Sequence, residues 1–297
     1  MILAITGATG FVGSHLVDQA LAAGHQVRAL TRREQPARDG VTWVAGNLAG
    51  PGTLVEGADA VIHVAGIVNA ADRAGFVSGN IDGTRSMISA AGAAGVQRFV
   101  HVSSLAAREP HLSDYGWSKS QSERLVQLSG LDWTIVRPPA VFGPRDHEML
   151  ELFRFASRGI VPLPPRGNRL SVIAAEDLAR LLLTLATGDG ARHMMLEPDD
   201  GRPGGWDHRD FARALAKAVG RRALPVSLPG AVLSGAARLD RMFRGQRAKL
   251  TPDRVGYFRH PDWIAHALPS PALWRAEHDT AAALARTAEW YRAHDLL

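Results

Sequence analysis

The 297-residue sequence contains no cysteine, which excludes disulfide bonds and thiolate metal sites. No apolar run is long enough to span a bilayer. The twelve histidines show no metal-ligand spacing such as His-Glu-x-x-His. The first apolar run begins at Ile2, so we expect no signal peptide. These absences favour a cytoplasmic protein with no bound metal and no membrane partner.

Lysine is also scarce, because only three of the 34 basic residues are Lys, and the formal net charge is +5. A basic chain could bind nucleic acid. The arginines, however, are scattered along the whole chain, with no basic run and no interleaved aromatic residues. We therefore attribute the charge to composition and to anionic small ligands, and we predict no nucleic-acid partner. Hydrophobic residues make up 46% of the chain, enough for a core in one large domain or two lobes.

A glycine-rich turn follows the first apolar run. Residues 2–6 predict a short strand and residues 14–23 predict a helix, with Gly7, Gly10 and Gly13 between them. Gly7 permits a tight turn, Gly10 lets backbone N–H groups approach a pyrophosphate, and Gly13 lets the helix pack close to the strand. The helix N-terminus adds N–H groups and a positive dipole end. This order of elements predicts a dinucleotide-binding site.

The second predicted strand, residues 26–31, indicates which dinucleotide binds. NAD-specific folds usually place Asp or Glu at the end of this strand, where it holds the ribose hydroxyls. Here Thr31 is followed by Arg32 and Arg33. Two guanidinium groups would bind a 2′-phosphate that an acid would repel. A charge-assisted hydrogen bond contributes ~1.5–3 kcal/mol, so a ten- to hundredfold preference for NADP follows, with NAD as the alternative.

A tyrosine–lysine pair follows the predicted strand 98–102. That strand ends in Ser103 and Ser104, and Tyr115 and Lys119 come next on one face of a predicted helix. With three Tyr and three Lys in the chain, such a spacing arises by chance with a probability of roughly 0.03. A free Tyr titrates near pH ~10, and a neighbouring ammonium lowers that pKa. Tyr115 could then exchange a proton with an alkoxide, while Ser104 orients the carbonyl group and Lys119 holds the nicotinamide ribose.

These motifs together resemble the extended branch of the short-chain dehydrogenase/reductase superfamily, the NAD(P)-dependent epimerase/dehydratase family. The resemblance rests on TGATGFVG at 6–13, Tyr115-x-x-x-Lys119, NIDGT at 80–84 and RPPAVFGP at 137–144, and it covers the chain to roughly residue 186. It implies an α/β, Rossmann-type doubly wound parallel sheet with a smaller C-terminal α/β substrate lobe. Members often pair through helices after the fourth and fifth strands, which implies a homodimer.

The resemblance also assigns roles to individual residues. It favours Ser104 over Ser103 as the catalytic serine, together with Tyr115 and Lys119, and implies that Asn80 supports an active-site water chain. Asn47 stands where the family usually has an Asp near the adenine, and it can replace that Asp as a partner for the adenine amino group. With the residue arguments above, the predicted cofactor contacts are Gly7, Thr9, Gly10, Phe11, Val12, Gly13, Thr31, Arg32, Arg33, Asn47, Leu48, Val64, Ala65, Gly66, Ser103, Tyr115, Lys119, Pro138, Ala140 and Val141.

Two departures from the family pattern narrow the activity. Ala140 stands where sugar-nucleotide enzymes commonly carry an Asn that helps to hold their substrate. Ser104 is followed by LAA at 105–107, whereas sugar dehydratases have an acid and a base in this region. We therefore predict an NADP-dependent oxidoreductase acting on a carbonyl or alcohol carbon of a non-nucleotide small molecule. The alternatives are an NAD(P)-dependent epimerase of a sugar derivative, and a non-catalytic dinucleotide-binding scaffold or redox sensor.

The second half of the chain carries weaker signals. We place the dinucleotide-binding core at residues 1–145, with returning elements around 166–190, and the substrate lobe mainly at 146–297. Residues 162–165 predict a loop, Asp207 a cap for a helix at 208–219, and Pro225 an edge position in a strand. We expect a helix at 231–243. Possible pocket or lid residues, each more easily explained as packing, are Met242, Phe243, Phe258 and Trp263.

Overall fold

The computed structural model describes residues 1–164, 167–232, 235, 240, 242, 253, 255–256 and 260–297. The chain divides into two compact units, each assembled from separate stretches of sequence. The first unit comprises Met1–Pro138, Glu176–Pro198 and Ala267–Trp274. The second unit comprises Pro139–Ala175, Asp199–His266 and Arg275–Leu297.

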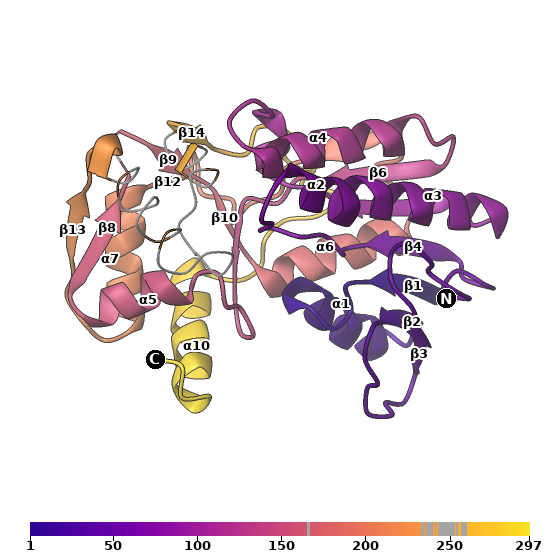
Figure 1. Ribbon diagram of the computed structural model, residues 1–297. Helices are drawn as coiled ribbons and strands as arrows, with labels where there is room; N and C mark the ends of the chain where they lie inside the picture. Colours follow the sequence, from indigo (N-terminus) through magenta and orange to yellow (C-terminus); the bar gives the residue numbers. More distant parts are fainter. Residues whose placement is uncertain are drawn as a thin grey trace. The chain divides into compact units, whose positions relative to one another are not determined.

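A seven-stranded parallel sheet forms the centre of the first unit (Figure 1). From one edge to the other its strands are β11 (Met194–Leu196), β6 (Asp132–Val136), β5 (Arg98–Val102), β4 (Ala60–His63), β1 (Ile2–Thr6), β2 (Gln26–Thr31) and β3 (Val41–Ala45). The strand order reverses at β1, because β2 and β3 extend to one side and β4 to the other. In such sheets ligands bind beyond the carboxyl ends of the strands at this switch point. The predicted doubly wound Rossmann-type fold is confirmed.

Helices cover both faces of this sheet. They are α1 (Phe11–Ala22), α2 (Arg73–Phe76), a π-helical turn (Val77–Asp82), α3 (Gly83–Ala93), a 3-10 turn (Leu105–Arg108), α4 (Asp114–Gln127) and α6 (Ala175–Thr187). Figure 1 shows α3 and α4 on one face, and α1 and α6 on the other. Beneath α3 and α4, the fully buried Val61, Phe99 and Ile135 of the sheet pack with Met87 and Val126. Burying each of these large side chains contributes roughly 1.5–3 kcal/mol.

Arg98 fastens helix α6 to the sheet. Its buried guanidinium donates hydrogen bonds to the carbonyl oxygen of Leu185 at 2.9 and 2.6 Å, and to the carbonyl oxygen of Asp132 at 2.9 Å. It also donates to Oγ1 of Thr134 at 2.8 Å. Burial, and then the nearby charge of Arg192, lower the pKa of Arg98 to about 10. The guanidinium therefore stays charged at neutral pH, and it joins β5, β6 and α6.

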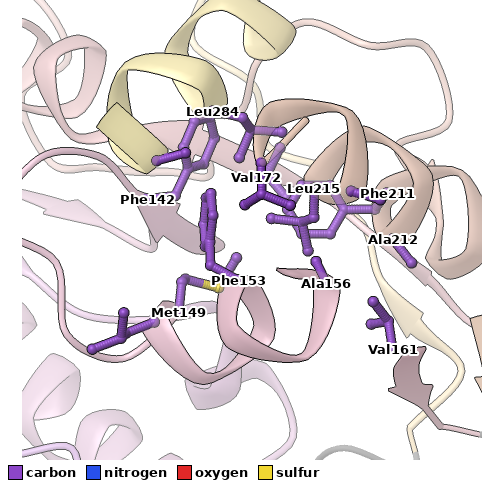
Figure 2. Close-up of a cluster of buried hydrophobic side chains, with 14 of the residues drawn as sticks. Phe142, Met149, Phe153, Ala156, Val161, Val172, Phe211, Ala212, Leu215 and Leu284 are labelled. Atoms are coloured by element: carbon purple, nitrogen blue, oxygen red, sulfur yellow. The ribbon is translucent and has the colours of Figure 1, made fainter. Parts of the chain in front are cut away.

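In the residues that the structure describes, the second unit packs helices against three small sheets. The helices described there are α5 (Leu150–Ser157), α7 (His208–Ala218) and α10 (Thr280–Ala293). The sheets pair β7 (Ala140–Phe142) with β10 (Val172–Ala174), β8 (Ile160–Leu163) with β13 (Leu224–Ser227), and β9 (Arg169–Leu170) with both β12 (Trp206–Asp207) and β14 (Asp262–Trp263). Figure 2 shows its apolar core, where Phe142 and Phe153 lie near Leu215 and Leu284. Tyr291 is fully buried in the same cluster and donates a hydrogen bond to Asp146 at 3.1 Å.

The sequence predicted the N-terminal cap of α7 in this unit but did not predict strand β8. Asp207 caps α7 as predicted, because its carboxylate accepts a hydrogen bond from the N–H of Arg209 at 2.8 Å. The loop prediction at 162–165 was wrong for Pro162 and Leu163, which lie within strand β8; Pro164 lies outside the strand, and Pro165 is outside the described residues. Pro162 and Pro225 are tolerated because a two-stranded sheet consists of edge strands alone, where a missing N–H costs nothing in the ladder.

Other expectations fall partly outside the described residues. Phe243, Phe258 and most of the predicted helix at 231–243 lie there. Of the remaining pocket or lid candidates, Met242 is exposed and Trp263 lies half-buried in β14. Within the described ranges, no helix is long and apolar enough to cross a membrane.

Candidate active site

The glycine turn lies between the end of β1 and the start of α1. Gly7 has a φ of +72°, and a side chain there would place its Cβ 2.8 Å from the backbone nitrogen of Ala65. A Cβ on Gly13 would lie 2.0 Å from the carbonyl oxygen of Gly7. Gly10 occupies the N-cap of α1 with extended backbone, and no side chain caps the helix. The turn therefore presents backbone N–H groups and a helix dipole, as a pyrophosphate requires.

Exposed arginines follow the end of strand β2. Arg32 and Arg33 are exposed, and neither side chain has a hydrogen-bond or ion-pair partner among the residues that the structure describes. Thr31 is buried, and its hydroxyl donates to the carbonyl oxygen of Arg33 at 2.6 Å and accepts from its N–H at 3.2 Å. Thr31 therefore shapes the backbone here through its hydroxyl, while both guanidinium groups stay available to an anion.

The next segments along the sheet edge are built from small residues and one asparagine turn. Asn47 follows β3, and its side-chain oxygen accepts hydrogen bonds from the N–H groups of Ala49 at 2.9 Å and Gly50 at 3.2 Å. The oxygen predicted to meet an adenine amino group thus also holds a turn together. After β4, a Cβ on Gly66 would lie 3.0 Å from both Asn80 Oδ1 and Lys119 Nζ. A glycine at position 66 therefore leaves room for these two polar groups.

Helix α4 carries the tyrosine–lysine pair. Its N-cap is Ser113, whose hydroxyl accepts a hydrogen bond from the N–H of Gly116 at 3.0 Å. Tyr115 is half-buried, with its ring 6.1 Å from that of Phe76. Lys119 is 5% exposed, and its ammonium donates to the carbonyl oxygen of Val102 at 3.0 Å. Burial lowers the pKa of Lys119 to about 8, although the charge of Glu123 opposes that shift.

The two serines after β5 have different partners. Ser103 is buried, and its hydroxyl donates to Glu123 Oε1 at 2.6 Å. Ser104 is half-buried, and its hydroxyl accepts a hydrogen bond from the N–H of Ala106 at 3.2 Å at the start of the 3-10 turn. The proton of Ser103 is therefore committed to a carboxylate, whereas Ser104 has a proton to offer to a carbonyl oxygen.

Asn80 joins three elements of the site. Its side chain accepts from the N–H of Ile67 at 2.8 Å and donates to the carbonyl oxygen of Ile67 at 3.1 Å. The amide also donates to Ser118 Oγ on α4 at 2.9 Å. This buried amide therefore fixes the loop after β4 against the helix that carries Tyr115 and Lys119.

A buried network of charges lies on the same side of the sheet, and motif analysis of the sequence missed it. Glu123 receives two hydrogen bonds from Arg137, at 2.8 and 2.6 Å. Glu197 then lies 3.5 Å from Arg137 and 3.2 Å from Arg108. Although burial disfavours the charge of Arg137, hydrogen bonds and the charges of Glu123 and Glu197 hold its pKa above the ordinary value. The available sequence signal was Glu123, one helical turn after Lys119.

Two histidines lie beneath the lysine. His63 and His101 are register partners on β4 and β5, and their rings stack 5.4 Å apart. His63 bonds Thr6 Oγ1 at 2.8 Å and Thr84 Oγ1 at 3.2 Å. Neither ring nitrogen of His101 has a hydrogen-bond partner among the described residues. Burial, and then the neighbouring Lys119, lower the pKa of His63 to about 3, and burial lowers that of His101 as well. Both rings are neutral.

The first unit therefore contains most of the predicted site. The glycine turn (including Thr9, Phe11 and Val12), Thr31 to Arg33, Asn47, Leu48, Val64 to Gly66, Asn80, Ser103, Ser104, Tyr115, Lys119 and Pro138 all belong to it. Ala140 and Val141 belong to strand β7 of the second unit. In the described part of the chain, no group of three or more His, Asp or Glu side chains could hold a metal ion.

Comparison with known proteins gives concordant matches. Residues 7–188 match the family described as NAD(P)H-binding. The chain is 35% identical over 306 residues to the ceramide reductase of Caulobacter vibrioides, covering 98% of this chain and 95% of that protein. It is 37% identical over 175 residues to sterol demethylase protein B of Methylococcus capsulatus, covering 49% and 53%. The structure of MoeE5 in complex with UDP-glucose and NAD shares the fold, with a TM-score of 0.75, 21% identity and 99% coverage of both chains.

Proposed function

The chain belongs to the NAD(P)H-binding family of enzymes, within the extended short-chain dehydrogenases/reductases, and on this premise we propose that it is an NADP-dependent carbonyl reductase. The proposed substrate is an apolar, ceramide-like carbonyl compound, by likeness to the relative named as a ceramide reductase. The observation that carries the proposal is the buried ammonium of Lys119, one helical turn from Tyr115, in a chain with only three lysines.

The residues of the first unit fit a dinucleotide. The glycine turn would hold the pyrophosphate, and Arg32 and Arg33 would bind the 2′-phosphate with guanidinium groups that have no other partner among the described residues. Asn47 and Leu48 would meet the adenine, and the small residues from Val64 to Gly66, with Ser103 and Pro138, would border the nicotinamide half. Bound NADPH supplies the hydride.

Three side chains would manage the proton and the oxygen. Ser104 donates a hydrogen bond to the carbonyl oxygen and orients it. Tyr115 gives its phenolic proton to that oxygen as the carbon is reduced, so that the product is an alcohol. Lys119 favours the phenolate left behind, because a nearby ammonium stabilises a negative charge in a buried site. Asn80 fixes the loop after β4 against helix α4.

Calorimetric titration with NADPH and NADH tests the cofactor part of the proposal. We expect NADPH to bind ten- to a hundredfold more tightly than NADH, and this preference to collapse in Arg32→Ala/Arg33→Ala. The matched control is Arg38→Ala, because Arg38 lies in the same segment but pairs with Asp18 at 2.7 Å. Equal binding of the two dinucleotides by the wild-type protein would refute the assignment of the arginines and favour an NAD-dependent epimerase.

Oxidation of NADPH in the presence of a ceramide-like ketone tests the chemistry. We expect turnover by the wild-type protein and a loss of at least about a hundredfold in Tyr115→Phe, with NADPH affinity retained. Unchanged function of Tyr115→Phe would contradict the catalytic proposal and favour a dinucleotide-binding scaffold or redox sensor.

A further inference from the structure

The carboxylate of Glu123 occupies the centre of the charged network behind the tyrosine–lysine pair. Glu123 is 3% exposed and lies one helical turn after Lys119 on α4. Its Oε1 accepts hydrogen bonds from Ser103 at 2.6 Å and from Arg137 at 2.8 Å, and its Oε2 accepts one from Arg137 at 2.6 Å. Three donors from two other segments therefore fix both oxygens.

The surroundings of Lys119 contain few charges. From β5 it meets the carbonyl oxygen of Val102 and the neutral ring of His101, and from β4 the neutral ring of His63. The loop after β4 and the π-helical turn bring Gly66 and the amide of Asn80. Its own helix carries Tyr115 and Glu123. Among the described residues, Glu123 supplies the negative charge that opposes deprotonation of the buried ammonium.

The network also contacts the segment at the end of β5 that leads into Ser103 and Ser104. Lys119 holds the carbonyl oxygen of Val102 and Glu123 holds the hydroxyl of Ser103, so two successive residues of the chain are tied to one face of α4. Ser104 comes next. On its far side, Glu123 is held by Arg137, which contacts Glu197 in turn.

We propose that Glu123 is a positioning residue of this site: its carboxylate, fixed by Arg137, keeps the buried Lys119 ammonium charged and holds the segment that presents Ser104. The inference rests on the proposed function, in which Lys119 acts on Tyr115. Without the carboxylate, the ammonium is left among dipoles and neutral rings, where burial favours its neutral form. A neutral amine no longer stabilises the phenolate of Tyr115.

The scarcity of lysine permits a direct test on the full-length protein. A sample labelled with carbon-13 at the lysine ε-carbon gives signals from three lysines, and the Lys119→Met variant assigns one of them. Titration of that signal reports the pKa of Lys119 without substrate or cofactor. We expect a value near 8 in the wild-type protein and a fall of at least about one unit in Glu123→Gln. Glu123→Asp, which keeps the negative charge, should bring the pKa of Lys119 most of the way back to the wild-type value.

Folding of the variants is controlled separately. Glu123→Gln leaves the half-buried Arg137 short of a partner, so the double variant Glu123→Gln/Arg137→Gln, which removes both charges, provides a second sample. The pKa of Lys119 should fall in it too, but by less, because a positive charge is removed along with the carboxylate. Glu151→Gln is the matched control, because Glu151 pairs with Arg154 at 2.9 Å near the surface of the second unit. The proposal would be overturned if the pKa of Lys119 were unchanged in Glu123→Gln and in the double variant, in protein with wild-type circular dichroism.

Kinetics give an independent readout. In Glu123→Gln the loss of kcat at high pH should begin at least about one pH unit lower than in the wild-type enzyme, with KM for the ketone unchanged. A uniform loss of kcat at every pH would show a merely structural role and overturn the assignment. The NMR titration does not depend on substrate, so failure of the ketone assay alone refutes the proposed function and leaves the inference about Glu123 to the titration.

Discussion

Adding one methyl group to Gly13 should disrupt the dinucleotide turn. The Cβ of an alanine there would lie 2.0 Å from the carbonyl oxygen of Gly7 and 2.6 Å from its carbonyl carbon. Non-bonded carbon atoms prefer about 3.5–4.0 Å, so the backbone must move by more than about 1 Å. Gly7 cannot yield freely, because its oxygen accepts a hydrogen bond from Gly10 at 2.9 Å and its own Cα faces the backbone of Ala65.

The magnitude follows from two opposing effects. Overpacking of a rigid contact costs about 3 kcal/mol, while replacing glycine by alanine in a helix returns about 1 kcal/mol. We expect Gly13→Ala to lower the free energy of unfolding by about 2 kcal/mol in urea denaturation followed by circular dichroism. Because the displaced turn also holds the pyrophosphate, NADPH affinity in calorimetry should fall about tenfold or more, since tenfold corresponds to about 1.4 kcal/mol.

Gly92 offers the same substitution without the contact. It lies exposed in α3, where an added Cβ meets nothing within 4 Å. Gly92→Ala should therefore raise the free energy of unfolding by about 0.5–1 kcal/mol and leave NADPH binding unchanged. If Gly13→Ala behaves like Gly92→Ala in both measurements, helix α1 does not pack closely enough on the turn for a Cβ at position 13 to clash with Gly7.

Three further predictions follow from individual side chains. Because burial lowers the pKa of Lys119 from 10.5 to about 8, the folded protein releases a proton that the unfolded chain keeps. Stability in urea should therefore rise by up to about 3 kcal/mol between pH 8 and 10.5; Lys119→Met should lose this rise and the control Lys217→Met should keep it. In steady-state kinetics, Ser104→Ala should lower kcat about 10²- to 10³-fold, and Ser103→Ala by a smaller factor; the reverse order would exchange their roles. Asp207→Ala should cost about 1 kcal/mol in thermal unfolding by loss of the α7 cap, and no loss would contradict the capping geometry.

Features that depend on near neighbours in the chain could be predicted from the sequence. Strand β1 has the predicted bounds because a short apolar run meets a glycine turn, and Asp207 caps α7 because an N-cap uses an N–H two residues on. Asn47 is a local feature that was not predicted. Its type and position suggested a partner for adenine, whereas in the structure its side-chain oxygen accepts hydrogen bonds from N–H groups two and three residues further along the chain.

Contacts between distant segments could not be predicted in this way. Glu123 and Arg137 are 14 residues apart, and Arg137 and Glu197 are 60 apart, so no local pattern pairs them. Pro162 was assigned to a loop because its strand partner, Val226, comes from an element far along the chain. A buried ion pair becomes visible only when the sheet brings its members together, because a charged residue in a sequence is ordinarily a solvated one.

The chain path has a consequence for synthesis. The polypeptide passes between the two units five times, so neither unit is encoded by one contiguous stretch. A fragment ending at Pro138 would carry the glycine turn, Tyr115 and Lys119, yet it would lack both strand β11 and the Leu185 carbonyl that receives Arg98. During synthesis, one edge of β6 therefore stays unpaired until some sixty further residues have been made and β11 can pair with it. Assembly of the sheet is completed late, and a gene cut at the apparent domain boundary would release an aggregation-prone edge in place of an independent nucleotide-binding module.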